Sequence, residues 1–141
     1  MSPTNDETKT NTQVVREFTR VFKNEHNIDG IHHLFAPDFQ HHFKPPVQPG
    51  LKGFKDIGRK MNTAFPDVVV TEEDLIAAGD KVVERSSAVA THRASLMGER
   101  PTNKQVRWTE IHIYRIRGGK IAEHWVEFAM MELLKQIGAV N

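Results

Sequence analysis

Residues 106–128 read VRWTEIHIYRIRGGKIAEHWVEF, two runs rich in β-branched and aromatic residues separated by Gly118 and Gly119. Runs of this composition favour strands, and a glycine turn between them favours an antiparallel hairpin. Large polar side chains alternate with other residues along both runs, and alternate residues of a strand point to opposite faces. The stretch therefore predicts a hairpin with one ionisable face, which is more typical of a cavity wall than of a core.

Helices are expected before most of the strands. Apolar residues recur at helical spacing in the first part of the chain, and β-rich runs dominate from Val68 onward. That order predicts an α+β fold, a curved antiparallel sheet with three N-terminal helices on one face. The expected elements are a helix from Asn11 or Thr12 to Phe22, a short helix over 28–35, an extended segment over 39–43, a pocket-rim loop at Pro45, Pro46, Pro49 and Gly50, a helix over 54–64, strands over 68–76, 81–92, 106–117 and 121–128, and a closing helix over 130–137.

The length of the chain predicts one domain. Its 141 residues are enough to bury a single core. Residues 1–11 are polar and contain Pro3, a composition that buries too little apolar surface to order itself. We expect a disordered tail over 1–11 and a single domain over 12–141.

Composition excludes several classes of function. Lysine and arginine total 19 against 18 acidic residues, so the net charge of +1 offers no broad attraction for nucleic acid or for an anionic membrane. The absence of cysteine excludes disulfides and thiol chemistry and fits a cytoplasmic protein. No phosphate-binding or dinucleotide-binding glycine motif is present, and no serine-nucleophile motif.

The eight histidines suggest proton transfer or metal binding. His32-His33 and His41-His42 look like metal-binding pairs, but neighbouring residues diverge on a helix and point to opposite faces on a strand. No metalloprotease-type spacing occurs. We therefore expect no metal site and no cofactor.

The run from Val106 to Arg117 has two chemically different faces. Its alternate side chains form two sets: Trp108, Glu110, His112 and Tyr114, and Thr109, Ile111, Ile113 and Arg115. Either the isoleucines pack under the helices while Glu110 and His112 face solvent or a partner subunit, or the polar set turns inward. In the second arrangement Glu110 and His112 would form a coupled acid-base pair.

The next run poses a similar choice. Glu123, Trp125 and Glu127 share one face, opposite Ala122, His124, Val126 and Phe128. Trp125 is either core packing or a pocket wall, and its flat apolar surface would suit a planar ligand. His92, at the end of the 81–92 run, either enters the mouth of a site or lies exposed in a loop.

A series of short motifs follows the order and spacing of a known family. They are Pro49-Gly50 with Gly53, Ala64-Phe65-Pro66-Asp67, Glu73-Asp74-Leu75-Ile76, Gly79-Asp80-Lys81-Val82-Val83, Thr91-His92, Met97-Gly98, Pro101-Thr102, Gly119-Lys120-Ile121, Glu123-His124-Trp125, Leu133-Leu134 and Gln136-Ile137-Gly138. From residue 12 onward the chain resembles the SnoaL-like polyketide cyclases, or ester cyclases, of the nuclear-transport-factor-2-like superfamily. The resemblance implies a cone-shaped α+β barrel with a deep apolar pocket, frequent homodimers, and cofactor-free ring closure by acid-base residues.

The resemblance also assigns individual positions. His42 and His92 resemble two motif histidines of the family and Trp125 its pocket tryptophan, while Ala129 stands where the cyclases have their acid-base aspartate. Because alanine has no proton to give, the family's ring-closing mechanism does not transfer intact.

Two functions are therefore expected. The first is acid-base catalysis on a small apolar or polyketide-like carbonyl compound in a cytoplasmic homodimer. The alternative is a binding protein of the same fold that has lost the chemistry. The expected catalytic residues are His92, Glu110, His112 and Glu127, and the expected substrate-binding residues are His42, Trp108, Trp125, Ala129, Phe18 and Met61.

Overall fold

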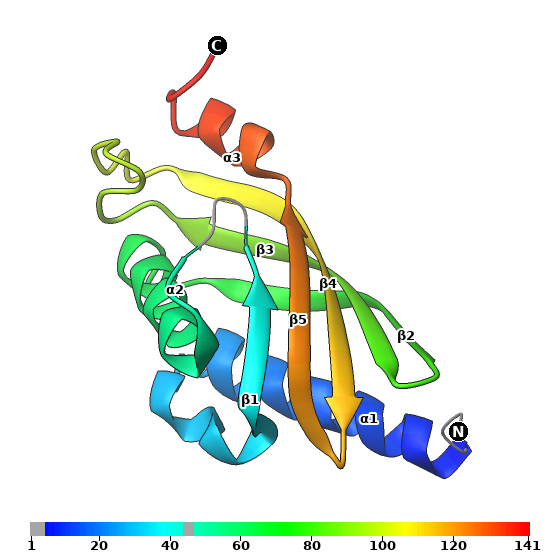
Figure 1. Cartoon of the computed structure of the whole chain (residues 1–141). Helices are drawn as coiled ribbons and strands as arrows, with labels where there is room; N and C mark the ends of the chain where they lie inside the picture. The colour runs from blue at the N-terminus through cyan, green and yellow to red at the C-terminus, as the bar shows by residue number, and fades with distance from the viewer. Residues whose placement is uncertain (1–4, 44–46) are drawn as a thin grey trace.

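A computed structural model describes residues 5–43 and 47–141 and has the predicted α+β fold (Figure 1). The helix predicted over 28–35 is a 3-10 helix, a type used in short pieces, and the prolines predicted at the pocket rim, Pro45 and Pro46, lie outside the described residues. The elements are α1 (Asn5–Phe18), a π-helical segment η1 (Thr19–Asn24), the 3-10 helix η2 (Ile28–Leu34), β1 (Phe35–His42), α2 (Gly50–Ala64), β2 (Val69–Ala78), β3 (Lys81–Thr91), β4 (Gln105–Arg117), β5 (Lys120–Phe128) and α3 (Met130–Gln136).

The five strands form one sheet in the order β1-β5-β4-β3-β2. The pairs among β2, β3, β4 and β5 are antiparallel, as predicted from the turns at Gly79-Asp80 and Gly118-Gly119 and the loop that contains Pro101, whereas β1 runs parallel to β5. The sheet is therefore mixed, which corrects the expectation of a purely antiparallel one. No hairpin turn joins β1 to its neighbour, so local turn chemistry does not set its direction.

The first helix begins earlier than predicted. The prediction of a disordered tail is wrong for residues 5–11, which belong to α1, and residues 1–4 lie outside the described part. Asn11 is buried, and Val15 and Phe18 one and two turns later are fully buried in the core. Once packing anchors those turns, each further residue adds a backbone hydrogen bond without a new nucleation cost.

Helices α1 and α2 pack against the curved sheet, and α3 lies near the far end of β4 and β5 (Figure 1). Under α1 and α2 the core is rich in phenylalanine, and under α3 it contains Phe65, Trp108, Leu133 and Ile137. The phenylalanine cluster contains Phe18, Phe22, Phe35, Phe39 and Phe54. Phe18, Phe22 and Phe54 come from the helical layer, whereas Phe35 and Phe39 come from β1 of the sheet, so the cluster joins the two layers.

The inner face of β4 is the polar one. Glu110 is 6% exposed and His112 4%, whereas Ile111 between them is 45% exposed. The second arrangement of this strand is therefore the correct one, and burial of the isoleucines under the helices is wrong. The ionisable groups of β4 therefore face the apolar side chains of the helices. Glu110 and His112 are stabilised there by pairing with each other.

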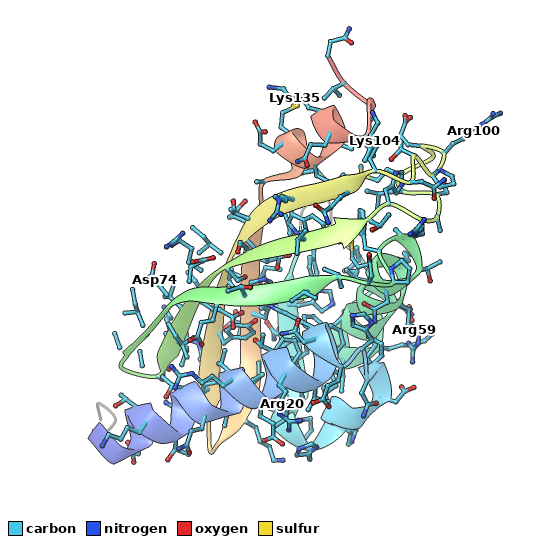
Figure 2. All side chains as sticks on the ribbon, turned by 180° about the vertical axis from the view of Figure 1, so that it is seen from behind. Arg20, Arg59, Asp74, Arg100, Lys104 and Lys135 are labelled. Carbon is cyan, nitrogen blue, oxygen red and sulfur yellow. The ribbon has the colours of Figure 1, made fainter. Side chains whose placement is uncertain are left out.

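Many other charged side chains project outward. Figure 2 shows Asp74 at the edge of the sheet, Arg100 at the tip of the loop between β3 and β4, and Lys135 on α3, all directed away from the body of the fold.

Within the described residues, no helix is both long and apolar enough to cross a membrane.

Candidate active site

A cavity of about 80 Å³ lies between the inner faces of β4 and β5, η1 and α2. Pockets for drug-sized ligands measure roughly 300–1,000 Å³, so only a small group fits without side-chain movement. Most of the wall is apolar, and all the polar groups except that of Asn62 on α2 lie on the sheet side and on η1. The apolar wall includes Phe18, Phe22, Phe43, Phe54, Met61 and Phe128, and the polar groups are those of Lys23, Asn62, Trp108, Glu110, His112 and His124.

Three buried side chains form a hydrogen-bonded chain along this wall. Glu110 Oε1 lies 2.5 Å from His112 Nε2, and His112 Nδ1 lies 2.8 Å from His124 Nε2. The indole N–H of Trp108 donates to the other carboxylate oxygen of Glu110 at 2.6 Å. The remaining ring nitrogen, His124 Nδ1, is buried and has no hydrogen-bond partner among the described residues.

Protonation states follow from these contacts. Burial raises the pKa of Glu110, but His112, Lys23 and Trp108 outweigh it and lower the pKa to about 2. Burial lowers the pKa of His112, and burial followed by the charge of His112 lowers the pKa of His124 well below its usual value. Glu110 is thus ionised at neutral pH and both histidines are neutral.

The tautomers then follow in order. An ionised carboxylate can only accept a hydrogen bond, so His112 Nε2 carries the proton shared with Glu110. The Nδ1 atom of a neutral His112 must then accept, so His124 Nε2 donates to it. The chain therefore ends at a basic lone pair on His124 Nδ1.

A second buried carboxylate is paired with lysine beside this chain. Glu84 is fully buried and accepts from Lys23 Nζ at 2.9 Å, from Thr19 Oγ1 at 2.7 Å and from the Tyr114 hydroxyl at 3.4 Å. Burial raises the pKa of Glu84, but Lys23 and Thr19 outweigh it and lower the pKa. Lys23 Nζ also lies 4.0 Å from Glu110 Oε1, so one ammonium stands between two carboxylates.

Comparison with known proteins gives the family. The sequence model of the SnoaL-like polyketide cyclase family matches residues 12–137, nearly the whole chain. The chain belongs to the SnoaL-like polyketide cyclase family. The comparison with curated proteins finds no significant match.

Several solved structures have the same fold. AclR of Streptomyces galilaeus, a proposed hydroxylase, is 25% identical with a TM-score of 0.86, and the match covers 95% of this chain and 99% of AclR. TsrD of Streptomyces laurentii is 26% identical with a TM-score of 0.84, covering 94% and 97% of the two chains. IdmH of Streptomyces antibioticus, a proposed polyketide cyclase, is 28% identical with a TM-score of 0.79, covering 91% and 98%.

Five of the predicted site residues lie together in this SnoaL-like cavity. Glu110, His112 and Trp108 come from the inner face of β4, Phe18 from the end of α1 and Met61 from α2. Strand alternation predicted the first three as one set, and helical spacing predicted the other two as inward-facing. The hydrogen bonds among the β4 side chains make them one unit.

Three predicted residues lie on the outer face of the sheet. In the β4–β5 register Tyr114 pairs with His124, so His124 faces inward and its neighbour Trp125 faces outward. Trp125 stacks on His42 with ring centroids 5.1 Å apart, and Glu127 is exposed on the same face of β5. The expectation that Trp125, His42 and Glu127 contribute to the pocket is therefore wrong.

Two more predicted residues lie elsewhere. His92 is fully buried away from the cavity, where Nδ1 contacts Thr102 and the ring packs near Phe65, so it holds the loop between β3 and β4. Ala129 donates its backbone N–H to the Thr109 carbonyl at the start of α3. It borders a separate hollow of about 380 Å³, which is larger than the cavity but outside the buried ionisable network.

The sequence reasoning missed three groups of the site: His124, Lys23 and Glu84. The sequence carried a signal for two of them, His124 and Glu84. His124 shares its strand face with Ala122, Val126 and Phe128, and Glu84 shares its face with buried residues on β3. An ionisable residue among small or apolar ones marks an inward face. Lys23 lies one helical turn after Thr19, but nothing local indicated its partner on β3.

Proposed function

We propose that the cavity catalyses cofactor-free proton transfer on an apolar carbonyl compound, leading to ring closure of a polyketide-like substrate. One observation carries the proposal: the chain Glu110–His112–His124 lies in the wall of an apolar cavity and ends at a basic nitrogen that has no hydrogen-bond partner among the described residues. A general base needs a lone pair within reach of the proton it removes, and it must be unprotonated at the working pH, with greatest efficiency when its pKa is near that pH. His124 Nδ1 meets the second condition because its pKa is lowered.

The reaction begins with enolisation. His124 Nδ1 takes a proton from the carbon next to a carbonyl group, the C–H bond breaks, and its electron pair forms an enolate. His124 Nε2 passes its proton to His112 Nδ1, and His112 Nε2 passes its own to Glu110. Both histidines end neutral, so no buried imidazolium persists. Glu110 is a carboxylic acid only while the enolate exists, because its low pKa favours return of the proton.

Ring closure follows from the enolate. Its carbon attacks a second carbonyl carbon of the same molecule, a C–C bond forms, and the second oxygen becomes an alkoxide. The alkoxide is protonated by the relay running in reverse, which returns Glu110 to its ionised form. This sequence consumes no oxidant, reductant or metal and needs no acidic group at position 129.

The size of the cavity bears on the substrate. A cavity of about 80 Å³ accommodates the enolisable end of a molecule. A larger part of the substrate enters only if the side chain of Met61 or Phe43 moves. Methionine has three rotatable bonds and adapts readily to new neighbours. We therefore propose that the reacting end enters the cavity while the rest of the substrate displaces α2 side chains.

Ala129 favours a second function, binding without turnover, since the family's acid-base aspartate is absent. One experiment separates the two functions. Pentane-2,4-dione is a small enolisable probe, and exchange of its central hydrogens with deuterium is followed by NMR. If the protein is an enzyme, exchange should be faster than in buffer alone. The exchange rate should then fall roughly 100-fold or more in Glu110→Gln and in His124→Gln. Glu127→Gln, on the outer face, is the control. Probe binding with exchange no faster than buffer would reject catalysis and leave the binding function.

The homodimer and the cytoplasmic location stay predictions. The outer sheet face exposes Val69 at 54% and Ile111 at 45%, which gives a self-association surface something apolar to bury. Light scattering of the wild-type protein and of Ile111→Glu measures the oligomeric state. Cell fractionation tests the cytoplasmic location.

A further inference from the structure

Lys23 occupies an unusual place in the backbone. It lies in η1, the π-helical segment that continues α1, where the Glu25 N–H donates to the Arg20 carbonyl five residues earlier at 2.8 Å. Such wide turns are rare and are frequent at functional sites. Here Thr19 and Lys23, one turn apart, both reach Glu84 on β3.

The ammonium group is anchored but not saturated. Its side chain is 10% exposed and contacts the cavity, and it donates to Glu84 at 2.9 Å. The 4.0 Å separation from Glu110 is too long for a hydrogen bond. An ammonium has three N–H groups, and among the described residues Lys23 donates to Glu84 alone, so it has donor capacity left beside the cavity.

We propose that Lys23 is the electrophilic catalytic residue of this cavity, donating to the enolate oxygen of a β-dicarbonyl-type substrate, with Glu84 as its anchor. The inference rests on the proposed function and adds a group and a substrate class to it. It follows from how charge moves in the reaction. At rest the cation Lys23 and the anion Glu110 line the cavity, and a second anion, Glu84, is paired with Lys23.

Proton transfer relocates one of those anions. When Glu110 receives the relayed proton it becomes neutral, and the negative charge it carried appears on the substrate oxygen. The total charge of the protein groups and the substrate is unchanged. Lys23 exchanges a carboxylate 4.0 Å away, too far for a hydrogen bond, for an enolate oxygen to which it donates one. An interaction that strengthens only as charge develops accelerates the chemical step. Each carbonyl of a β-dicarbonyl shares this charge, which suits a single fixed cation.

A purely structural ion pair is the competing explanation, and a matched pair of variants separates the two. The single variant Glu84→Gln keeps the Lys23 ammonium, and the double variant Lys23→Met/Glu84→Gln removes it. Because position 84 is a neutral glutamine in both, neither variant leaves an unpaired buried carboxylate there. Lys60→Met, at an exposed position of α2, controls for loss of a lysine. Circular dichroism establishes that each variant is folded.

Two readouts use pentane-2,4-dione as the probe. The enolate absorbs at longer wavelength than the neutral enol, so absorbance titration gives the preference for bound enolate over bound neutral probe. We expect Glu84→Gln to keep or raise this preference, and the double variant to lose about 10-fold relative to it. Deuterium exchange should fall roughly 100-fold between the same two variants, the effect of removing one oxyanion donor.

The outcomes distinguish this inference from the proposed function. A folded double variant that equals Glu84→Gln in both readouts overturns the role of Lys23 and leaves the relay intact. Conversely, wild-type protein that does not catalyse exchange, but binds the enolate in a Lys23-dependent way, refutes the relay and supports Lys23 as the anion-binding group.

Discussion

Lys23→Met is the most informative test of the buried charges on stability. Lys23 Nζ and Glu84 Oε1 are 2.9 Å apart, and Glu84 is fully buried. Coulomb's law at an effective dielectric of about 20 gives 332/(20 × 2.9), roughly 6 kcal/mol of attraction, before the cost of removing both groups from water. Removing one partner of a buried pair typically costs about 3–5 kcal/mol, because the other charge stays buried. Thr19 and Tyr114 still donate to Glu84, so we expect a cost near the lower limit, about 3 kcal/mol.

The same variant should change the pH dependence of stability. In the wild-type protein the pKa of Glu84 is lowered, so its contribution is present above the unfolded pKa and is lost as pH falls through the folded pKa. Without Lys23, burial dominates and the folded pKa rises above the unfolded one. The destabilisation should then be largest near pH 8 and shrink toward pH 5, where Glu84 can protonate.

Urea unfolding measures both effects. Tryptophan fluorescence follows the transition at pH 5 and pH 8 in the wild-type protein, in Lys23→Met, in Glu84→Gln and in the double variant. The double variant should be more stable than Lys23→Met, because no buried charge is left unpaired. A cost below about 1 kcal/mol for Lys23→Met, or a double variant whose cost is the sum of the two single costs, would refute the reasoning.

Three further predictions follow from the site. Because the pKa of His124 is lowered well below 6.5, the rate of deuterium exchange should stay constant from about pH 8 to pH 6 and fall only in stronger acid. An inflection of the rate near pH 6.5 would contradict the assignment of His124 as the base. Trp125→Phe, on the outer face, should leave the exchange rate unchanged. Trp108→Phe removes a hydrogen bond to the Glu110 carboxylate and should slow exchange roughly 10-fold in the same assay. Gly58→Ala places a Cβ 2.3 Å from the Phe22 ring in a packed aromatic cluster and should cost about 1–3 kcal/mol in urea unfolding, so a neutral result would mean that the cluster relaxes.

Most of the fold was predictable because its signals are local. Turn glycines and β-rich composition placed β2, β3, β4 and β5 close to their observed bounds, and helical spacing placed α2 and α3. The first helix was predicted too short, since polar residues 5–11 gain their helical order from turns anchored in the core. The direction of β1 depends on a partner more than 80 positions away and carries no local signal, as the His42–Trp125 pairing illustrates.

The site was predictable in part. Glu110, His112 and Trp108 share one strand face, and that face could be read from alternation. On β5 the same alternation was read with the wrong face inward, which favoured Trp125 over His124. The motif histidine at position 92 holds a loop through Thr102 and lies away from the cavity.

The amino-acid sequence by itself determined the α+β order of elements, the family, and which side chains stand together on each strand. Only the tertiary structure decided which of the two faces is inside and which distant groups meet there. The physical reason is that a two-residue repeat is symmetric, so it separates two faces without saying which one the helices cover. Lys23 and Glu84 are 61 positions apart, and only the packing of η1 against β3 makes them a pair.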